Sequence, residues 1–116
     1  SFCYVDDLMT GIYSLLMSDY TQPMNIGNPS EISIADFATE IIELTQSDQK
    51  VIFKDLPVND PKQRRPDITK AENILNWSPK VDRSEGLKIT YEYFKSLTKD
   101  ELNETAHYNF DDYITR

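Results

Sequence analysis

The sequence predicts an α/β fold with short parallel strands and about four helices. Short segments rich in β-branched and aromatic residues alternate with longer segments whose apolar residues recur at helical spacing. One segment–helix–segment succession predicts a βαβ unit, in which a right-handed crossover joins two parallel strands. Apolar residues make up 39% and charged residues 28% of the 116 positions, which is a globular composition. Because two short strands do not form a stable sheet alone, we expect that helices cover them or that they extend a sheet formed by residues outside this chain.

The chain opens on a short strand or extended segment at residues 2–5, and a helix is predicted near residues 7–18. Asp6 and Asp7 place carboxylates at the start of this helix, where free N–H groups and the helix dipole favour negative charge. The apolar residues that follow recur at helical spacing: Leu8, Ile12, Leu15 and Leu16.

The predicted βαβ unit comes next, with strands at residues 24–27 and 51–54. Its helix covers residues 34–46 and carries a broad apolar face. Ser33 and Asp36 stand three residues apart at its start, in a spacing that resembles a capping box with Asp in place of Glu.

The C-terminal half is predicted to be irregular over residues 54–66, where three prolines occur. Thr69 is expected to cap a short helix that carries Ile74 and Leu75, and Ser84 a last helix near residues 85–97. The side chains expected to point inward from the last helix are Leu87, Tyr91, Phe94 and Leu97. Residues 98–116 are expected to form an acidic, loosely held tail.

Composition excludes several classes of protein. A formal net charge of -8 argues against sequence-independent nucleic-acid binding, which requires a basic face. One cysteine, Cys3, and one histidine, His107, do not supply a usual zinc site, and no metal site is predicted. Three widely spaced glycines cannot form a glycine-rich phosphate loop, so a self-contained dinucleotide-binding enzyme is excluded. Since the chain starts inside an apolar segment without a methionine or signal peptide, we expect an excised C-terminal piece of a longer protein.

The basic segment Lys62–Arg65 is the one local reversal of charge, and it lies between prolines. Arginine matches phosphate through its planar fork of donors, so the segment is a candidate clamp for a phosphate or diphosphate. The alternative is a solvated basic loop that pairs with nearby carboxylates. The sequence leaves both interpretations open.

Two further patterns favour structural roles. Asp6 and Asp7 have the residue types of a metal or acid–base pair, but adjacent carboxylates at a helix start are more often caps. Tyr91 and Lys95 have the Tyr-x-x-x-Lys spacing of a dehydrogenase pair. Because Tyr91 falls in the apolar repeat of the last helix, we interpret the pair as a core tyrosine and a surface lysine.

Several motifs then occur in a fixed order along residues 1–97. They are Phe2-Cys3-Tyr4-Val5-Asp6-Asp7-Leu8, Asn25-Ile26-Gly27-Asn28-Pro29, Asp60-Pro61-Lys62-Gln63-Arg64-Arg65-Pro66-Asp67-Ile68, and Leu75-Asn76-Trp77-Ser78-Pro79 followed by Glu85-Gly86-Leu87. Together they resemble the extended short-chain dehydrogenases, the NAD-dependent epimerase/dehydratase family that acts on nucleotide sugars. Asn76 replaces the glycine that is usual in the family's last motif.

The resemblance implies that residues 1–97 form the C-terminal substrate-binding domain of a Rossmann-type enzyme. NAD would be bound by an N-terminal Rossmann domain outside this chain, and the catalytic Tyr-x-x-x-Lys pair would lie there too. This chain would hold no catalytic or cofactor-binding residue and would be inactive alone. Without the Rossmann domain that it would pack against, the chain would expose an apolar face and would be poorly soluble or self-associate.

Within that family the motifs are most similar to those of UDP-glucuronate decarboxylases. The resemblance therefore implies oxidation at C4 of the sugar, loss of CO2 and reduction by NADH to give UDP-xylose. The alternatives are another nucleotide-sugar epimerase or 4,6-dehydratase, a non-catalytic UDP-binding module, or a structural or interaction domain. We also expect a cytoplasmic homodimer that binds a UDP-sugar and no nucleic acid.

The substrate-binding residues implied by the resemblance are Arg64, Asp67 and Phe2. Arg64 would contact the UDP diphosphate. Asp67 would lie near the ribose or orient the arginine, and Phe2 would line the nucleotide pocket.

Overall fold

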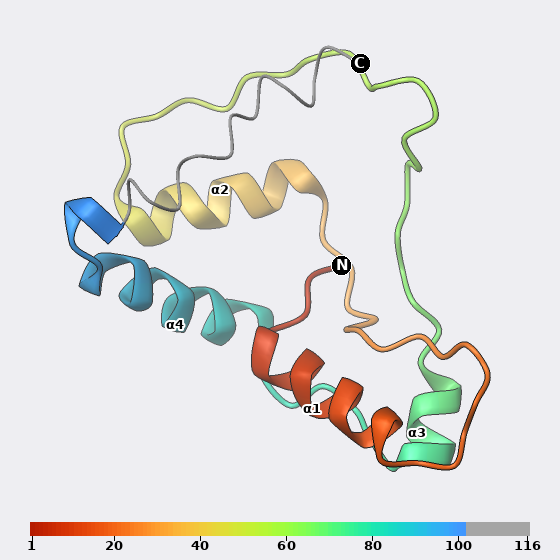
Figure 1. Cartoon of the computed structure of the whole chain (residues 1–116). Coiled ribbons are helices and arrows are strands. Elements are labelled where there is room, and N and C mark those ends of the chain that lie inside the picture. Colours follow the sequence, from red (N-terminus) through yellow and green to blue (C-terminus); the bar gives the residue numbers. More distant parts are fainter. Residues whose placement is uncertain (102–116) are drawn as a thin grey trace.

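The computed structural model describes residues 1–101, and four helices organise this part of the chain (Figure 1). The helices are α1 (Val5–Leu16), α2 (Ile34–Thr45), α3 (Thr69–Leu75) and α4 (Arg83–Ser96). The predicted tail of residues 98–116 falls mostly outside the described residues, as does His107. Within residues 1–101, no helix is long and apolar enough to cross a bilayer.

The predicted α/β fold is wrong, because no β-strand occurs among residues 1–101. Only α2 of the expected βαβ unit forms. The segments 24–27 and 51–54 lie in different parts of the molecule, so neither gives the other the ladder partner that a strand requires (Figure 1). Ile52 and Phe53 are 74% and 84% exposed, so no half-buried surface supports the β-propensity of that segment.

The four predicted helices are confirmed, with small shifts at their ends. The Ser33 cap is also confirmed: its Oγ accepts a hydrogen bond from the Asp36 main-chain N–H at 3.0 Å and donates to the Asp36 carboxylate at 2.7 Å. The predicted caps Thr69 and Ser84 are wrong. Each lies inside its helix, and the N-cap positions are occupied by Ile68 and Asp82.

The core lies between α1, α3 and the segment that follows α3. Its buried apolar residues are Ile68, Ala71 and Trp77, against which Met24, Ile26 and Leu75 pack. The Trp77 indole N–H faces the Asp7 carbonyl oxygen at 3.1 Å and the Thr10 hydroxyl oxygen at 3.2 Å. A Cβ at Gly11 would approach Trp77 Cε2 to 2.8 Å, so only glycine lets α1 lie this close to the indole.

Asp7 fixes the segment after Trp77 to α1. Its carboxylate is 6% exposed and accepts the main-chain N–H groups of Lys80 and Val81 at 2.9 and 2.8 Å. The start of α4 is thereby placed next to the start of α1, although more than 70 residues separate them in sequence.

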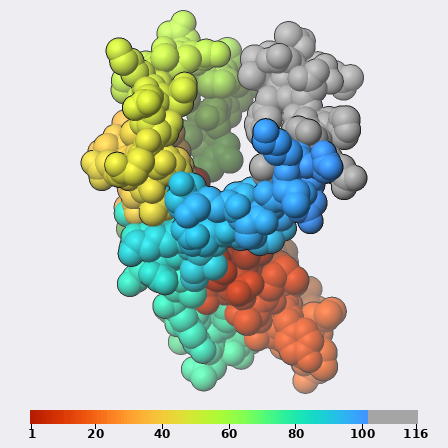
Figure 2. All heavy atoms as spheres, turned by 90° about the vertical axis from the view of Figure 1, so that its left-hand side faces the viewer, coloured from red at the N-terminus to blue at the C-terminus, as the bar shows by residue number. Residues whose placement is uncertain are grey.

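Helices α2 and α4 pack against each other more loosely. No residue of α2 is buried, and Gly86 is the buried residue of α4. The half-buried Arg83 guanidinium pairs with the Glu40 carboxylate at 2.9 Å between the two helices. Figure 2 shows α4 above α1, with the segment after α2 rising away as a separate arm.

An exposed apolar face was predicted, and the structure confirms it. The side chains of α1 that stay exposed recur at helical spacing: Val5, Met9, Ile12, Tyr13 and Leu16. Self-association through this face stays a prediction.

Candidate substrate-binding site

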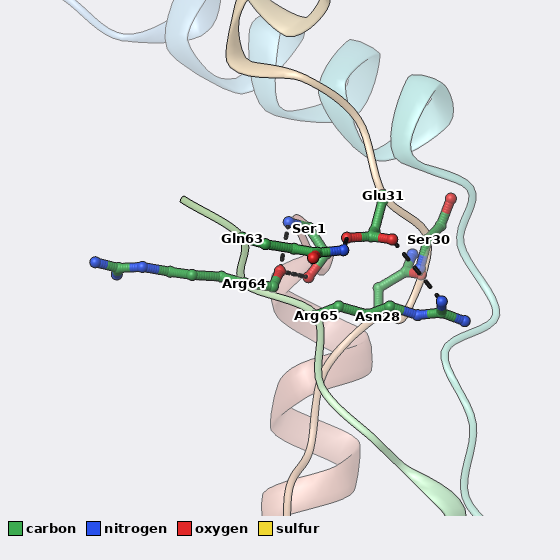
Figure 3. A network of polar contacts seen from close by, with 7 residues as sticks. All are labelled: Ser1, Asn28, Ser30, Glu31, Gln63, Arg64 and Arg65. Atoms are coloured by element: carbon green, nitrogen blue, oxygen red, sulfur yellow. Dashed lines mark hydrogen bonds and ion pairs between the residues drawn. The ribbon is translucent and has the colours of Figure 1, made fainter. Parts of the chain in front are cut away.

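Three segments meet around the basic residues 62–65, which we call the arginine loop (Figure 3). Both the Ser1 hydroxyl and the Ser1 main-chain nitrogen donate to the Arg64 carbonyl oxygen, at 3.0 and 3.1 Å. Glu31, from the turn before α2, accepts a hydrogen bond from the Gln63 side chain and lies 3.8 Å from the Arg65 guanidinium. The start of the chain, the turn before α2 and the arginine loop therefore form one polar cluster.

Arg64 points away from this cluster, in the direction opposite to Arg65 (Figure 3). Its side chain is 71% exposed and its guanidinium pairs with the Asp60 carboxylate at 2.6 Å. Exposed pairs of this kind contribute only about 0–1 kcal/mol, so a polyphosphate can displace Asp60. The geometry thus leaves Arg64 accessible to an anionic ligand.

Phe2 directly follows Ser1 of the polar cluster, and its side chain lies in apolar surroundings. Its ring stacks on Phe37 of α2, with ring centroids 3.9 Å apart and ring planes 21° apart. Both rings line an open cavity of about 600 Å³, whose walls come from residues 2–5, α2 and α4. The lining is predominantly apolar, which suits a flat hydrophobic or aromatic group.

Asp67 has a structural role at the start of α3. Hydrogen bonds from the side chain and the main-chain N–H of Thr69 lower the pKa of the Asp67 carboxyl below its usual value, because both favour the ionised form. The Asp67 carbonyl oxygen accepts a hydrogen bond from the Asn25 side chain at 3.1 Å. The residue thereby ties α3 to the turn that contains Gly27.

The three predicted site residues do not converge on one point. Asp67 lines a second cavity of about 390 Å³ together with Arg65, not Arg64. Phe2 lines the apolar cavity, and Arg64 points to solvent. Within the part of the chain that the structure describes, no hydrogen bond or ion pair joins any two of these three residues.

The sequence did not indicate the contacts of Glu31 or the long-range contacts of Asp7. The sequence held one signal for Glu31: it is an acidic residue two positions after Pro29, which ends the motif Asn25-Ile26-Gly27-Asn28-Pro29. Asp7 lies in the first turn of α1, as predicted, but it does not cap the helix: the N-cap is Tyr4, and the buried Asp7 carboxylate accepts hydrogen bonds from the segment after Trp77.

The remaining candidates show structural contacts. The Lys95 ammonium lies 5.2 Å from the Tyr91 ring centroid and donates to the Glu92 carboxylate at 3.1 Å. Cys3 is half-buried, and burial, followed by the charge of Asp7, raises the pKa of its thiol. Residues 1–101 contain no cluster of three or more His, Cys, Asp or Glu residues able to hold a metal ion.

The described residues do not fit a dinucleotide cofactor. Gly11 and Gly86 lie inside α1 and α4, where helix packing requires them, and Gly27 lies against Pro66. No glycine-rich turn leads into a helix in this part of the chain, so these residues offer no phosphate loop for NAD.

Known proteins similar to this chain are enzymes of nucleotide-sugar metabolism. UDP-glucuronic acid decarboxylase 6 of Arabidopsis thaliana is 42% identical over 95 residues, which cover 82% of this chain and 28% of the relative. UDP-glucuronic acid decarboxylase 1 of Xenopus tropicalis is 40% identical over 103 residues, covering 89% of this chain and 24% of the relative. The chain is homologous to a partial region of the UDP-glucuronic acid decarboxylases. The predicted resemblance is confirmed, and the chain spans about a quarter of these relatives.

A solved structure agrees with this assignment. A tyrosine-to-phenylalanine variant of UDP-glucuronic acid 4-epimerase from Bacillus cereus, in complex with UDP-4-deoxy-4-fluoro-glucuronic acid and NAD, superposes with a TM-score of 0.71 and 33% identity. The match covers 84% of this chain and 32% of the epimerase chain. No family model matches the chain.

Proposed function

We propose that the longer protein containing this chain decarboxylates UDP-glucuronate to UDP-xylose, and that this chain binds the UDP portion of the substrate. The observation that carries the proposal is the identity of 40–42% with UDP-glucuronic acid decarboxylases over most of the chain. The neighbouring epimerase, solved with a UDP-sugar and NAD, supports the same class of substrate.

In this proposal Arg64 supplies the charge that recognises the substrate. A diphosphate displaces Asp60 from the exposed guanidinium and accepts charge-assisted hydrogen bonds in its place. Phe2 presents an aromatic edge of the apolar cavity next to the polar cluster, where a nucleotide base can pack. Asp67 contributes by holding the start of α3 beneath the arginine loop. Redox chemistry at C4 of the sugar belongs to NAD and to residues outside this chain.

A second candidate function is 4-epimerisation of UDP-glucuronate. It is favoured by the 0.71 TM-score with the Bacillus cereus epimerase. The two reactions differ in their products, because a decarboxylase releases CO2 and an epimerase keeps the carboxylate.

The test uses the longer natural protein with NAD and UDP-glucuronate. The products are separated by chromatography and identified by mass spectrometry. Release of CO2 with formation of a UDP-pentose is expected. A product of unchanged mass would replace the proposal by epimerisation, and no turnover of UDP-glucuronate would overturn both.

The role of Arg64 is tested in the same protein. Arg64→Ala is expected to weaken UDP-sugar binding by about tenfold or more, because a charge-assisted contact is lost. The matched control is Lys50→Ala, which removes an exposed cation that does not belong to the arginine loop. An unchanged dissociation constant for Arg64→Ala would overturn the assignment.

We also propose that the whole protein is a cytoplasmic homodimer. The support is the resemblance to the family alone, and light scattering with cell fractionation would test it.

A further inference from the structure

Glu31 makes contacts on both sides of Arg64 along the chain. One carboxylate oxygen accepts the hydrogen bond from Gln63, and the other faces the Arg65 guanidinium (Figure 3). Gln63 and Arg65 directly precede and follow Arg64 in sequence. A single side chain from the turn before α2 therefore holds both neighbours of Arg64.

The Arg64 backbone has its own anchor. Its carbonyl oxygen accepts from Ser1 at 3.0 and 3.1 Å, while its side chain stays 71% exposed. The main chain around Arg64 is thus anchored, while its guanidinium is exposed and, in the part of the chain that the structure describes, makes only the surface pair with Asp60. Within residues 1–101, the side chains of Gln63 and Arg65 both make their polar contacts with Glu31.

The surroundings explain why such an anchor matters. The segment from residue 47 to the arginine loop is irregular and exposed, so its own packing does not fix the loop. Ordering a free backbone costs conformational entropy, and this cost reduces the affinity when a ligand must impose the order. A contact that orders the loop beforehand improves binding without touching the ligand.

We infer that Glu31 is a positioning residue that orients the arginine loop so that Arg64 presents its guanidinium to the diphosphate of the substrate. The inference rests on the proposed function, because it assumes that Arg64 binds the UDP portion. Glu31 also neutralises Arg65 and turns it away, so the two adjacent arginines have different roles.

Substrate affinity and melting temperature together distinguish a positioning role of Glu31 from a merely structural one. The Glu31 contacts are at the surface, with side chains 38% and 59% exposed for Glu31 and Arg65, so they contribute little to global stability. Loss of the contacts should therefore change substrate affinity while the melting temperature stays the same.

The experiment compares Glu31→Ala with Glu31→Gln in the longer natural protein, using titration calorimetry with UDP and steady-state kinetics. Glu31→Ala is expected to raise Kd and KM about threefold to tenfold with kcat nearly unchanged. Glu31→Gln keeps an oxygen acceptor for Gln63 but loses the charge facing Arg65, so an intermediate loss is expected. Glu43→Ala, an exposed glutamate of α2, is the matched control and should bind like the wild type.

A double-mutant cycle decides whether Glu31 acts through Arg64. In an Arg64→Ala background, Glu31→Ala is expected to cause no further loss of affinity, because the side chain it positions is absent. Equal losses in both backgrounds would overturn the inference, as would wild-type affinity in Glu31→Ala or a fall in melting temperature that accounts for the loss. Failure of the unsubstituted protein to bind UDP would instead overturn the proposed function.

Discussion

The half of the molecule built from α1, α3 and Trp77, which we call the packed half, differs sharply from the half built from α2 and α4, which we call the open half. The first half contains Ile68, Ala71, Trp77 and the buried carboxylate of Asp7. The second half has no buried residue in α2, and its helices meet through the half-buried pair of Arg83 and Glu40. The difference shows that helix formation does not by itself create a core, since both halves contain amphipathic helices.

The same contrast separates the candidate site residues. Asp67 lies at the edge of the packed half, where α3 fixes it. Arg64 lies on the exposed loop between α2 and α3. Ser1 donates to its carbonyl oxygen, and Glu31 contacts the neighbouring residues Gln63 and Arg65. The residue proposed to recognise the ligand, Arg64, is therefore separate from the residues that form the core.

The largest expected effect is loss of the indole that fills the packed half. Trp77→Ala should lower the free energy of unfolding by about 3–5 kcal/mol, because it removes a buried aromatic ring and leaves a cavity. Urea unfolding followed by far-UV circular dichroism measures the change. Phe53→Ala, at an 84% exposed position in the segment after α2, is the control. It should lower the free energy of unfolding by no more than about 0.5 kcal/mol. Similar losses at both positions would contradict the contrast between the halves.

Asp7 is expected to show the next largest effect. Asp7→Ala should lower the free energy of unfolding by about 2–4 kcal/mol, since the N–H groups of Lys80 and Val81 lose their acceptor. Asp7→Asn should cost less, because its amide oxygen still accepts. Asp6→Ala is the matched control at the adjacent exposed carboxylate, and an equal loss there would show that both residues act only as helix-start charges.

Asn76 tests the end of α3. It caps the helix with φ 50° and ψ 39°, in the left-handed region that favours glycine and asparagine. Asn76→Ala should lower the free energy of unfolding by about 1–2 kcal/mol, whereas Asn76→Gly should be neutral or stabilising. Asn73→Ala, within the helix, is the control. Stability equal to the wild type in Asn76→Ala would contradict the assigned conformation.

The smallest effect is expected between α2 and α4. Arg83→Ala should cost about 0.5–1 kcal/mol, and added salt should reduce this cost because the pair with Glu40 is only half-buried. A double-mutant cycle of Arg83→Ala and Glu40→Ala measures the pair itself. A coupling energy as large as the Asp7 effect would show that the open half is held as firmly as the packed half.

The helices and the similarity to UDP-glucuronic acid decarboxylases were predictable because their signals are local. Apolar spacing marked α1, α2 and α4, and the Ser33–Asp36 spacing marked the start of α2. The left-handed conformation of Asn76 now explains why asparagine stands where the family motif usually has glycine. Both residues adopt that conformation, so the departure leaves the helix end intact.

The strands were not predictable from propensity. Residues 51–54 have strand-forming side chains, but a strand also needs a partner that supplies hydrogen bonds, and residues 1–101 provide none. The caps failed for a related reason. Asp67, two positions before Thr69, accepts the main-chain N–H of Thr69 at 2.9 Å, so Thr69 is the first residue of α3 and not its cap.

The sequence by itself determined the helices, the basic loop that carries Arg64 and the relation to UDP-glucuronic acid decarboxylases. Each of these follows from residues close together along the chain. Only the tertiary structure decided that Asp7 binds the segment after Trp77, that Glu31 holds the neighbours of Arg64 and that Asp67 faces α3. The Asp7 and Glu31 contacts join residues more than 30 positions apart, and no local pattern states which distant donor a carboxylate will find. The packing of α1 against Trp77 decides the first, and the path of the arginine loop past the turn before α2 decides the second.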